Sequence, residues 1–409
     1  MTSGIQNSIC RSCLEPRLFS GIDLGVLPIS NELLLEGQTS TEEYPLHMWV
    51  CGNCCLGQVP EIVLPERLFS DYRYLSSVSS TFLEHAKDFC NGVMENGLVM
   101  EGDLVLEIAC NDGYLLKNFL GTEVKILGVE PAKNVSKRAS DLGIPVINEF
   151  FGADLATRII EEFGYPKLVI ANNVLAHVPN IRDFMLGLKI LCNSETRISI
   201  ENPSILNILD LNQFDTIYHE HFSYLSSHAV RNLAEMFGLN LTEVEELSTH
   251  GGSNRYWLQT GFVEDSPNVR ESLESEMRSG LIEANSWIQA QERMNLTVDV
   301  LRTWLEETKE RGELVLGYGA AAKASTILNY ARIEKSLLPS ICDLSEEKIG
   351  RRMPRVNCNI ISLPELLELK PDHVLVFPWN ISAEIVSQLK QDLPSSNFWV
   401  TIPSLRRLN

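Results

Sequence analysis

The stretch DLVLEIACNDGYLLKNFL, residues 103–120, decides the fold class. It opens with a mostly apolar run over 104–108, which is typical of a strand that is buried on both faces of a parallel sheet. A turn containing Asn111, Asp112 and Gly113 follows, and the apolar spacing after it predicts an amphipathic helix. Strand, glycine-containing turn and helix in this order form the first half of a βαβ unit.

The same unit is repeated along the middle of the chain. Two helices are expected near 132–142 and 153–163. The apolar segments around them are KILGVEP (125–131), IPVINEFF (144–151) and KLVIANNVLAHV (167–178). The repetition predicts a doubly wound, Rossmann-like α/β domain, in which ligands bind at the carboxyl ends of the strands.

Acidic residues lie where such a domain binds its ligand. The first turn has Ala109 and Cys110 in place of a glycine pair, so the dinucleotide fingerprint GxGxxG is absent there. Glu130 ends the second strand, where a carboxylate can accept both hydroxyls of a ribose. This combination is the pattern of class I S-adenosylmethionine enzymes. The predicted cofactor-binding residues are Glu107, Asn111, Asp112, Gly113, Glu130, Asn172 and Asn173.

Two CxxC pairs stand near the N-terminus. They are Cys10-Arg-Ser-Cys13 and Cys51-Gly-Asn-Cys54. Each pair can direct two thiolates at one ion, and four thiolates suit the tetrahedral preference of zinc. Cys55 can replace Cys54 in principle, although the CxxC spacing favours Cys54. With four sulfur ligands no position is left for water, so the predicted zinc is structural.

A second glycine-rich turn occurs late in the chain. Residues 270–313 predict one or two long connecting helices, and ELVLGYGAAAKAS (313–325) then repeats the strand, turn and helix. Gly317, Gly319 and Ala322 fit G-x-G-x-x-A, and Asp343 ends the next strand. This turn supports a rival hypothesis, a nicotinamide-dependent oxidoreductase.

Composition limits the other possibilities. A chain of 409 residues is expected to form two or three domains. Its formal net charge of −20 argues against a nucleic-acid partner, which requires a basic surface. We found no apolar run long enough to span a membrane and no pattern of a signal peptide, so a cytoplasmic protein with no membrane partner is expected.

Within the run DTIYHEHFSYLS (215–226), residues 218–224 gather two imidazoles, a carboxylate and two phenols. In an extended segment His219 and His221 would share one face and Glu220 would lie on the other. HGGSNRYW (250–257) predicts a loop over a polar ligand or a tight hairpin turn, with Arg255 as a candidate contact for a phosphate or carboxylate.

Several motifs together resemble the sugar C-methyltransferases that act on nucleotide-linked 4-keto-6-deoxyhexoses. The motifs are CRSC, CGNCCLGQV, DYRYLSSVSS, EIACNDGYLL, ANNVLAHVPN, ENP, TIYHEHFSYLS, THGGSNRYW, GYGAAAKASTILNY and DLSEEKIGR. The resemblance runs nearly end to end. It implies a zinc-binding domain at 1–70, a methyltransferase domain at 71–265, and a Rossmann-like C-terminal domain at 266–409 that binds the sugar nucleotide.

The resemblance also implies roles for single residues. His221 is the implied general base, which the sequence alone does not separate from His219. The implied catalytic residues are His221, Glu220, Tyr218, His177 and Tyr72. The implied substrate-binding residues are Tyr74, Asn202, His219, Tyr224, Arg255, Lys323 and Lys348. KIGRRMPRVNCNI (348–360) has fewer glycines than the family pattern, which leaves the nucleotide contacts there open.

The resulting hypothesis is transfer of a methyl group from S-adenosylmethionine to a carbon next to the sugar ketone, with C3 favoured over C5. The alternatives are the oxidoreductase, methylation of another small acceptor, and a noncatalytic zinc-containing scaffold. The expected partner is a nucleotide-activated keto-deoxysugar, and the chain is expected to be a monomer or homodimer. The sequence leaves open which nucleotide the sugar carries, any amino group on the sugar, and the stereochemistry.

Overall fold

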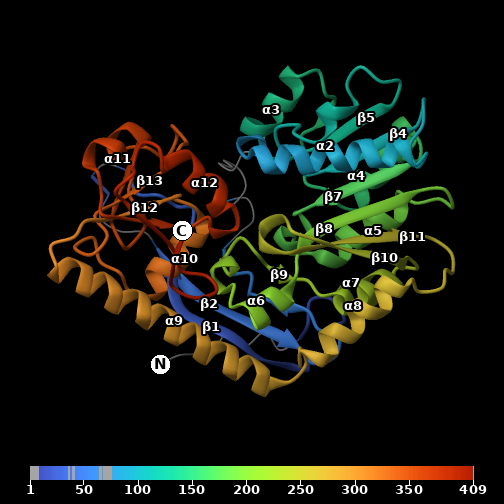
Figure 1. The fold of residues 1–409 in the computed structure, drawn as a ribbon. Coiled ribbons are helices and arrows are strands. Elements are labelled where there is room, and N and C mark those ends of the chain that lie inside the picture. Colours follow the sequence, from blue (N-terminus) through green and yellow to red (C-terminus); the bar gives the residue numbers. More distant parts are fainter. Residues whose placement is uncertain (1–8, 36, 39–41, 64–66, 68–75, 409) are drawn as a thin grey trace. The chain divides into compact units, whose positions relative to one another are not determined.

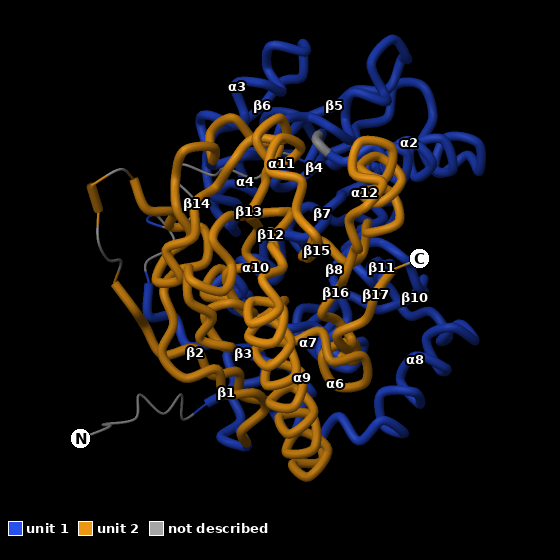
Figure 2. Tube along the Cα trace, turned by 60° about the vertical axis from the view of Figure 1, so that its left-hand side comes forward, with its two compact units in different colours: residues 1–18, 51–205, 221–282 blue, residues 19–50, 206–220, 283–409 orange. Residues whose placement is uncertain are grey.

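The computed structural model describes residues 9–35, 37–38, 42–63, 67 and 76–408 (Figure 1). The chain divides into two compact units, coloured separately in Figure 2. Unit 1 consists of residues 1–18, 51–205 and 221–282, and unit 2 of residues 19–50, 206–220 and 283–409. An early segment and one from the middle of the chain therefore belong to the same unit as the C-terminal third.

Unit 1 is built on a seven-stranded sheet with the order β10-β11-β8-β7-β4-β5-β6. Its strands are β4 (Leu104–Ile108), β5 (Lys125–Val129), β6 (Val146–Ile147), β7 (Leu168–Asn172), β8 (Arg197–Pro203), β10 (Asn240–Leu247) and β11 (Ser253–Gln259). Strands β4 to β8 are parallel, and β11 runs antiparallel to both β8 and β10. The predicted doubly wound α/β fold is confirmed.

Helices cover both faces of this sheet. They are α2 (Ser80–Glu95), α3 (Lys133–Asp141), α4 (Ala153–Phe163), α5 (Ile181–Ile190), α7 (Ser227–Met236) and α8 (Pro267–Arg278). Along β4, Leu104 and Leu106 belong to the core shared with α4, α5 and α7, whereas Val105 belongs to the core shared with α2 and α3. This alternation follows from the two-residue period of a strand, and it explains why the run reads as apolar throughout.

The predicted amphipathic helix after the first turn was wrong. The structure has a short 3-10 turn there, η2 (Leu116–Phe119). The Asn118 amide donates to the carbonyl oxygens of Tyr114 and Leu115, at 3.3 and 2.9 Å, so a side chain takes acceptors that a longer helix would need. Gly121 then adopts a φ of +83° and ends the segment.

Unit 2 contains a six-stranded sheet with the order β14-β13-β12-β15-β16-β17. Its strands are β12 (Val315–Tyr318), β13 (Ser340–Cys342), β14 (Asn359–Ile361), β15 (His373–Val376), β16 (Asn397–Val400) and β17 (Arg406–Leu408). Pairing is parallel except for β17, which is antiparallel to β16. The strand order reverses between β12 and β15. The switch point of this sheet therefore lies at the carboxyl ends of these two neighbouring strands.

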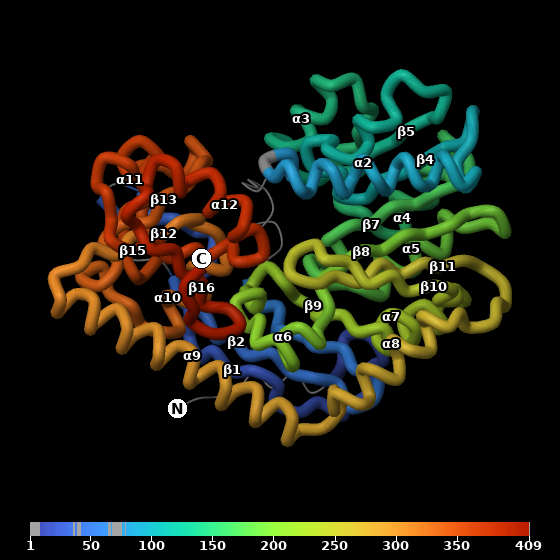
Figure 3. The backbone as a smooth tube through the Cα atoms, in the orientation of Figure 1, coloured from blue at the N-terminus to red at the C-terminus, as the bar shows by residue number. Residues whose placement is uncertain are grey.

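The predicted connecting helices are α8 and the long α9 (Ala284–Glu310), separated by residues 279–283, where Gly280 has a φ of +73° (Figure 3). The remaining helices of unit 2 are α6 (Ile205–Leu211), α10 (Ala322–Tyr330), α11 (Leu363–Leu369) and α12 (Ser382–Leu389). None of the helices in the described ranges is long and apolar enough to cross a membrane.

Shorter elements complete the chain. They are β1 (Leu18–Pro28), β2 (Glu43–Cys51), β3 (Gly57–Gln58), β9 (Ser223–Tyr224), η1 (Ser76–Val78), η3 (Leu175–His177), η4 (Phe214–Thr216), η5 (Thr249–Gly251) and η6 (Trp379–Ile381). Strand β1 is hydrogen-bonded to β2, and β3 pairs with β9. Two predicted site residues lie at 3-10 turns: His177 is the last residue of η3, and Tyr218 follows η4 by two positions.

Candidate functional site

The turn that follows β4 is built from residues in left-handed backbone conformations. Ala109, Asn111 and Gly113 have φ values of +58°, +51° and +79°. A Cβ at Gly113 would lie 2.5 Å from Cδ1 of Ile144, so this position has no room for a side chain. Alanine and asparagine therefore adopt, with some strain, conformations that a glycine pair adopts freely.

Buried carboxylates surround this turn. Glu130 accepts hydrogen bonds from the backbone N–H groups of Asn111 (3.1 Å) and Ala132 (2.9 Å). Burial raises the pKa of Glu130 and raises that of Glu107 well above its usual range, with the nearby negative charges of Glu130 and Asp112 adding to the effect on Glu107. Among the described residues, Oε2 of Glu107 and Oδ1 of Asp112 have no hydrogen-bond partner.

Amide oxygens add further acceptors at this carboxyl edge. Asn172 ends β7, and Asn173, with a φ of +54°, follows it. Their side-chain oxygens, and both polar side-chain atoms of buried Asn202, also lack a partner within the described ranges. A group of unpartnered acceptors at this edge suits a ligand that brings donors and positive charge. S-adenosylmethionine fits this requirement, because it carries ribose hydroxyls, an ammonium group and a sulfonium.

The segment before α2 is fastened to the same turn. The N–H of Ser76 donates to Oδ1 of Asn111 at 3.0 Å, and the N–H of Ser77 donates to Oδ2 of Asp112 at 3.3 Å. Phe82 stacks on Tyr114, with ring centroids 5.0 Å apart. The predicted site residues Tyr72 and Tyr74 lie outside the described residues.

A buried network of charged residues lies next to the carboxyl edge that carries Asn172, and no sequence pattern predicted it. Fully buried Glu201 lies beside Asn172 on the neighbouring strand. It pairs with Nε2 of His85 at 2.8 Å and with the guanidinium of Arg255 at 3.0 Å. Burial alone would raise the pKa of Glu201, but these two partners lower it below its usual value.

Arg255 is held by two carboxylates. Besides Glu201 it pairs with Glu245 at 2.9 Å, and its guanidinium lies 4.4 Å from the centre of the Phe89 ring. A contact between Arg255 and the substrate therefore remains a prediction that this geometry does not favour. His85 was missed because a single histidine on a helix carries no local signal of its partners.

Two histidines from distant parts of the sequence meet in unit 1. The rings of His177, in η3, and His221 have centroids 4.7 Å apart in an edge-on arrangement. The ring centre of Tyr224 lies 5.9 Å from that of His221, also in an edge-on arrangement. His177 follows β7 closely, so this pair is placed near the same carboxyl edge as Asn172 and Asn173.

The preceding part of the same run, residues 218–220, belongs to unit 2. His219 is buried, its Nε2 lies 3.3 Å from the carbonyl oxygen of Tyr44, and burial lowers its pKa. Glu220 is also buried, and Nδ2 of Asn31 donates to Oε1 of Glu220 at 3.0 Å. Burial raises the pKa of Glu220 to about 6. Tyr218 is half-buried.

The four predicted zinc ligands are brought together. The Sγ atoms of Cys10, Cys13, Cys51 and Cys54 lie within 4.8 Å of one another. The two knuckles are equivalent, because the N–H groups of Leu14 and Cys55 each close the turn onto the carbonyl of the first cysteine. Leu14 and Cys55 both have positive φ, at +64° and +63°. Cys55 thus occupies the position after the ligand, and the cluster uses Cys54.

The second glycine turn, after β12, has different surroundings. Gly319 has a φ of +89°, and a Cβ there would lie 2.4 Å from the ring of Pro378. Asp343, which a dinucleotide-binding site would use for the ribose, is already paired with Lys348 at 3.1 Å. Nζ of Lys348 also donates to the carbonyl oxygen of Ala320 at 3.1 Å. The oxidoreductase alternative is therefore not favoured.

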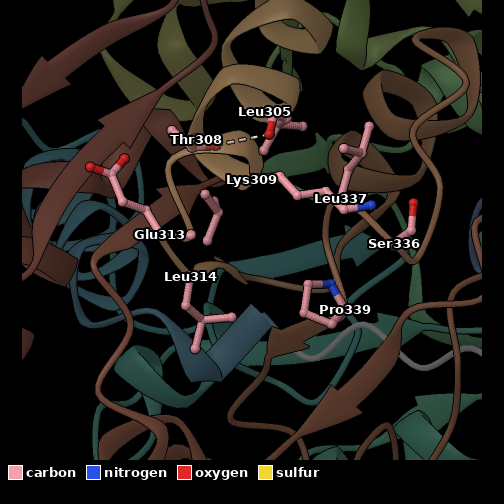
Figure 4. Close-up of a pocket in the computed structure, with 10 residues that line it drawn as sticks. Leu305, Thr308, Lys309, Glu313, Leu314, Ser336, Leu337 and Pro339 are labelled. Carbon is pink, nitrogen blue, oxygen red and sulfur yellow. Dashed lines mark hydrogen bonds between the residues drawn. The ribbon is translucent and has the colours of Figure 1, made fainter.

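Two cavities of unit 2 lie apart from these edges. One, of about 270 Å³, is lined by the end of α9 and the start of β12, including Thr308, Lys309, Glu313 and Ser336 (Figure 4). The other, of about 580 Å³, is lined by Arg351, Arg352 and Glu365 among others. The first lies at the amino end of β12, opposite the end where this fold class binds ligands.

Three family models match the chain. Residues 10–69 match a zinc-binding domain, residues 84–244 a methyltransferase domain, and residues 248–403 a C-methyltransferase C-terminal domain. C-methyltransferase NovU of Streptomyces niveus is 29% identical over 402 residues, which cover 97% of this chain and 96% of that protein. These matches confirm the predicted methyltransferase and zinc-binding domains.

Solved methyltransferase structures are similar over part of the chain. Magnesium protoporphyrin IX methyltransferase of Synechocystis PCC 6803 with bound SAH has 15% identity and a TM-score of 0.34, covering 48% of this chain and 92% of that one. An S-adenosylmethionine-dependent methyltransferase of Clostridium acetobutylicum has 12% identity and a TM-score of 0.35, covering 44% and 92%.

Proposed function

We propose that this chain is an S-adenosylmethionine-dependent C-methyltransferase that methylates a nucleotide-linked 4-keto-6-deoxyhexose. The carbon methylated is C3, next to the ketone. The observation that carries the proposal is the pairing of His177 and His221 close to the carboxyl edge that holds the cofactor-binding residues. A C-methyltransferase similar over nearly the full length supports the reaction class.

The chemistry requires a base. A carbon next to a ketone becomes nucleophilic only when it loses a proton, and imidazole has a pKa suited to that task near neutrality. His221 takes the proton from C3 in this proposal, and His177 lies against its ring. His219 does not compete for the role, because it is buried beside the backbone of Tyr44.

Negative charge then develops on the ketone oxygen. Hydrogen bonds that are already in place for this charge commonly contribute several kcal/mol in a water-poor site. His177 is the proposed donor, and Tyr218 and Tyr72 are proposed from the family resemblance alone. Glu220, with its pKa of about 6, can hold or release a proton near neutral pH and is proposed to pass it to solvent.

S-adenosylmethionine supplies a methyl group that is already activated by its sulfonium. Glu130 is proposed to accept the ribose hydroxyls, since it directly follows β5 at the carboxyl edge. Glu107, Asp112 and Asn172 offer unpartnered oxygens to the positive methionine end. These residues would fix the position of the cofactor, and the protein then needs only to align the deprotonated C3 with the methyl carbon and the sulfur. The C3–methyl bond would form as the methyl–sulfur bond breaks, with S-adenosylhomocysteine as the leaving group.

The proposal is tested by mass spectrometry of the sugar product. The protein is mixed with methyl-labelled S-adenosylmethionine and a freshly prepared thymidine diphosphate 4-keto-6-deoxyhexose. We expect the sugar to gain one labelled methyl group at C3, and His221→Ala to lower kcat by about 10²- to 10⁴-fold while S-adenosylhomocysteine still binds.

His47→Gln is the matched control, because His47 lies on β2, outside the proposed catalytic set, and should retain full activity. No labelled sugar from the wild type, with the cofactor still bound, would show that the acceptor is a different one. An active His221→Ala would exclude His221 as the base.

A further inference from the structure

The segment that carries His221 is hydrogen-bonded to residues that directly follow the second zinc knuckle. Strand β3 begins two residues after Cys55 and pairs antiparallel with β9. The N–H of Val59 extends this pairing, because it donates to the carbonyl oxygen of Phe222 at 3.1 Å. Strand β9 begins only two residues after His221. The proposed base therefore lies next to a strand that the knuckle holds.

A side-chain bond joins the end of the same segment to the knuckle itself. The hydroxyl of Ser226 donates to the carbonyl oxygen of Cys55 at 3.3 Å. It also accepts a bond from the N–H of Ala229 at 2.9 Å, so it caps the start of α7. Cys55 is the residue of positive φ whose N–H closes the knuckle turn. Residues 222–226 are thus attached at both of their ends to the stretch that follows Cys54.

A further contact attaches this segment to the end of β8. Leu225 forms a parallel bridge with Ser204, and the N–H of Ile205 donates to the carbonyl oxygen of Leu225 at 2.9 Å. Strand β8 pairs with β7, which ends in Asn172 at the cofactor-binding edge. Residues 222–226 therefore connect the zinc knuckles with the carboxyl edge of the sheet.

The first knuckle contacts the same two strands through Arg11, which lies inside the CRSC motif. Its guanidinium donates to the carbonyl oxygen of Val59 at 2.5 Å and lies 5.7 Å from the centre of the Phe222 ring. Its backbone N–H donates to the side-chain oxygen of Gln58 at 2.9 Å, and Gln58 is fully buried. Arg11 thus contacts both members of the pair, Val59 and Phe222, that lies closest in sequence to His221.

We propose that the zinc knuckles position the catalytic base, and that Arg11 is a positioning residue that connects them to His221 through β3 and β9. This inference rests on the proposed function, because it takes His221 as the base. Four thiolates leave no open position on a zinc ion, so the link is mechanical and the metal takes no part in methyl transfer. Displacement of a catalytic group by about 1 Å can cost about 100-fold in rate.

The first test compares amide hydrogen exchange, measured by mass spectrometry, before and after a chelator removes zinc. We expect exchange to rise about tenfold or more in residues 57–59 and 222–226, since the bonds between β3 and β9 lose their support. Residues 104–119 should keep their protection, because β4 is held by β5 and β7. The Kd for S-adenosylhomocysteine should therefore change by less than about twofold.

Unchanged exchange in residues 222–226 would refute the link. An equal rise throughout unit 1 would also refute it, because the zinc would then stabilise the whole unit rather than position one segment.

The second test uses the zinc-loaded protein. Arg11→Met keeps an apolar stem but removes the donor to Val59. We expect it to lower kcat by about tenfold while the KM for the sugar changes by less than about twofold. Arg11→Lys should recover most of kcat, because its ammonium can donate to the same carbonyl oxygen. Arg17→Met, an exposed arginine that follows the same knuckle, is the matched control and should retain the wild-type kcat.

Metal analysis and thermal melts establish that each variant is loaded and folded. A wild-type kcat in Arg11→Met would refute the role of Arg11, and so would an Arg11→Lys as impaired as Arg11→Met. The exchange test needs no turnover, so it separates the two proposals. Zinc-dependent protection of residues 222–226 in a protein that transfers no methyl group to the sugar would retain the link and reject the acceptor.

Discussion

The turn after β4 and the turn after β12 occupy the same place in two similar parallel sheets, yet their surroundings have opposite charge. Glu107, Asp112 and Glu130 surround the first turn, and within the described ranges one oxygen each of Glu107 and Asp112 has no donor. The second turn presents the ammonium of Lys323, and its nearby carboxylate, Asp343, is neutralised by Lys348. The first suits a cationic cofactor and the second an anionic substrate.

The difference teaches that topology determines where a ligand binds and side chains determine which ligand it is. Both sheets reverse strand order beside their first strand, so both have a crevice at the carboxyl edge. Reading only the glycines, one would assign the dinucleotide to the second turn. The ion pair of Asp343 with Lys348 and the hydrogen bond of Lys323 to Asn380 do not favour that assignment.

The largest effect should come from comparing two cations, Arg255 and Lys323. Arg255→Met removes one partner of the buried Glu201 and should lower the free energy of unfolding by about 3 kcal/mol. Lys323→Met should change it by less than about 1 kcal/mol, because the ammonium donates to the side chain of Asn380, lies on an indole, and attracts Asp215 without a direct ion pair in the described ranges. Urea denaturation measures both, and similar losses would mean that the two cations have the same structural role.

The next largest effect concerns cofactor binding at the first turn. Glu130→Ala should raise the Kd for S-adenosylhomocysteine by about 100-fold, since a carboxylate that accepts two ribose hydroxyls contributes about 3 kcal/mol. Binding of thymidine diphosphate should not change. Glu149→Ala, an exposed acid paired with Arg158, is the control, and equilibrium dialysis is the measurement. An unchanged Kd in Glu130→Ala would place the ribose elsewhere.

A smaller effect concerns pH and Glu220. Its folded pKa of about 6 is raised above the ordinary 4.5, so burial disfavours the charged form. Stability is therefore lost as pH rises from 4.5 to about 6, and the cost above that range is about 2 kcal/mol. Glu220→Gln should gain this stability relative to the wild type between about pH 5 and pH 7. A pH-independent difference between the two unfolding free energies would contradict the assignment.

The smallest effect tests the charge balance at the second turn. Asp343→Asn removes a partly exposed ion pair, so it should cost about 1 kcal/mol or less. Methyl transfer should stay within about twofold of the wild type, because Asp343 contacts neither proposed substrate. A large loss of activity would reopen the dinucleotide interpretation of this turn, and activity assays decide the point.

Local patterns were enough to predict much of this molecule. The strand at 104–108, the helix at 153–163 and the four cysteines each carry their own signal, and the structure places all three as expected. The short turn η2 was mistaken for a helix, because the amide of Asn118 competes for backbone acceptors in a way that apolar spacing does not reveal.

The features that could not be predicted from the sequence are contacts between residues that lie far apart along the chain. The bonds of Glu201 to His85 and of Trp379 to Asp215 join residues that are more than 100 positions apart. No spacing rule predicts such pairs. The proximity of His177 and His221 was expected only through the family resemblance. Arg255 was predicted to contact a ligand because no sequence pattern indicates that Glu201 and Glu245 are its partners.

The measurement that tests the central claim most directly is a calorimetric titration of the wild type with thymidine diphosphate after saturation with S-adenosylhomocysteine. If the two turns serve separate substrates of opposite charge, the protein binds one molecule of each at the same time. Displacement of S-adenosylhomocysteine, or no binding of thymidine diphosphate by a folded protein, would contradict the account.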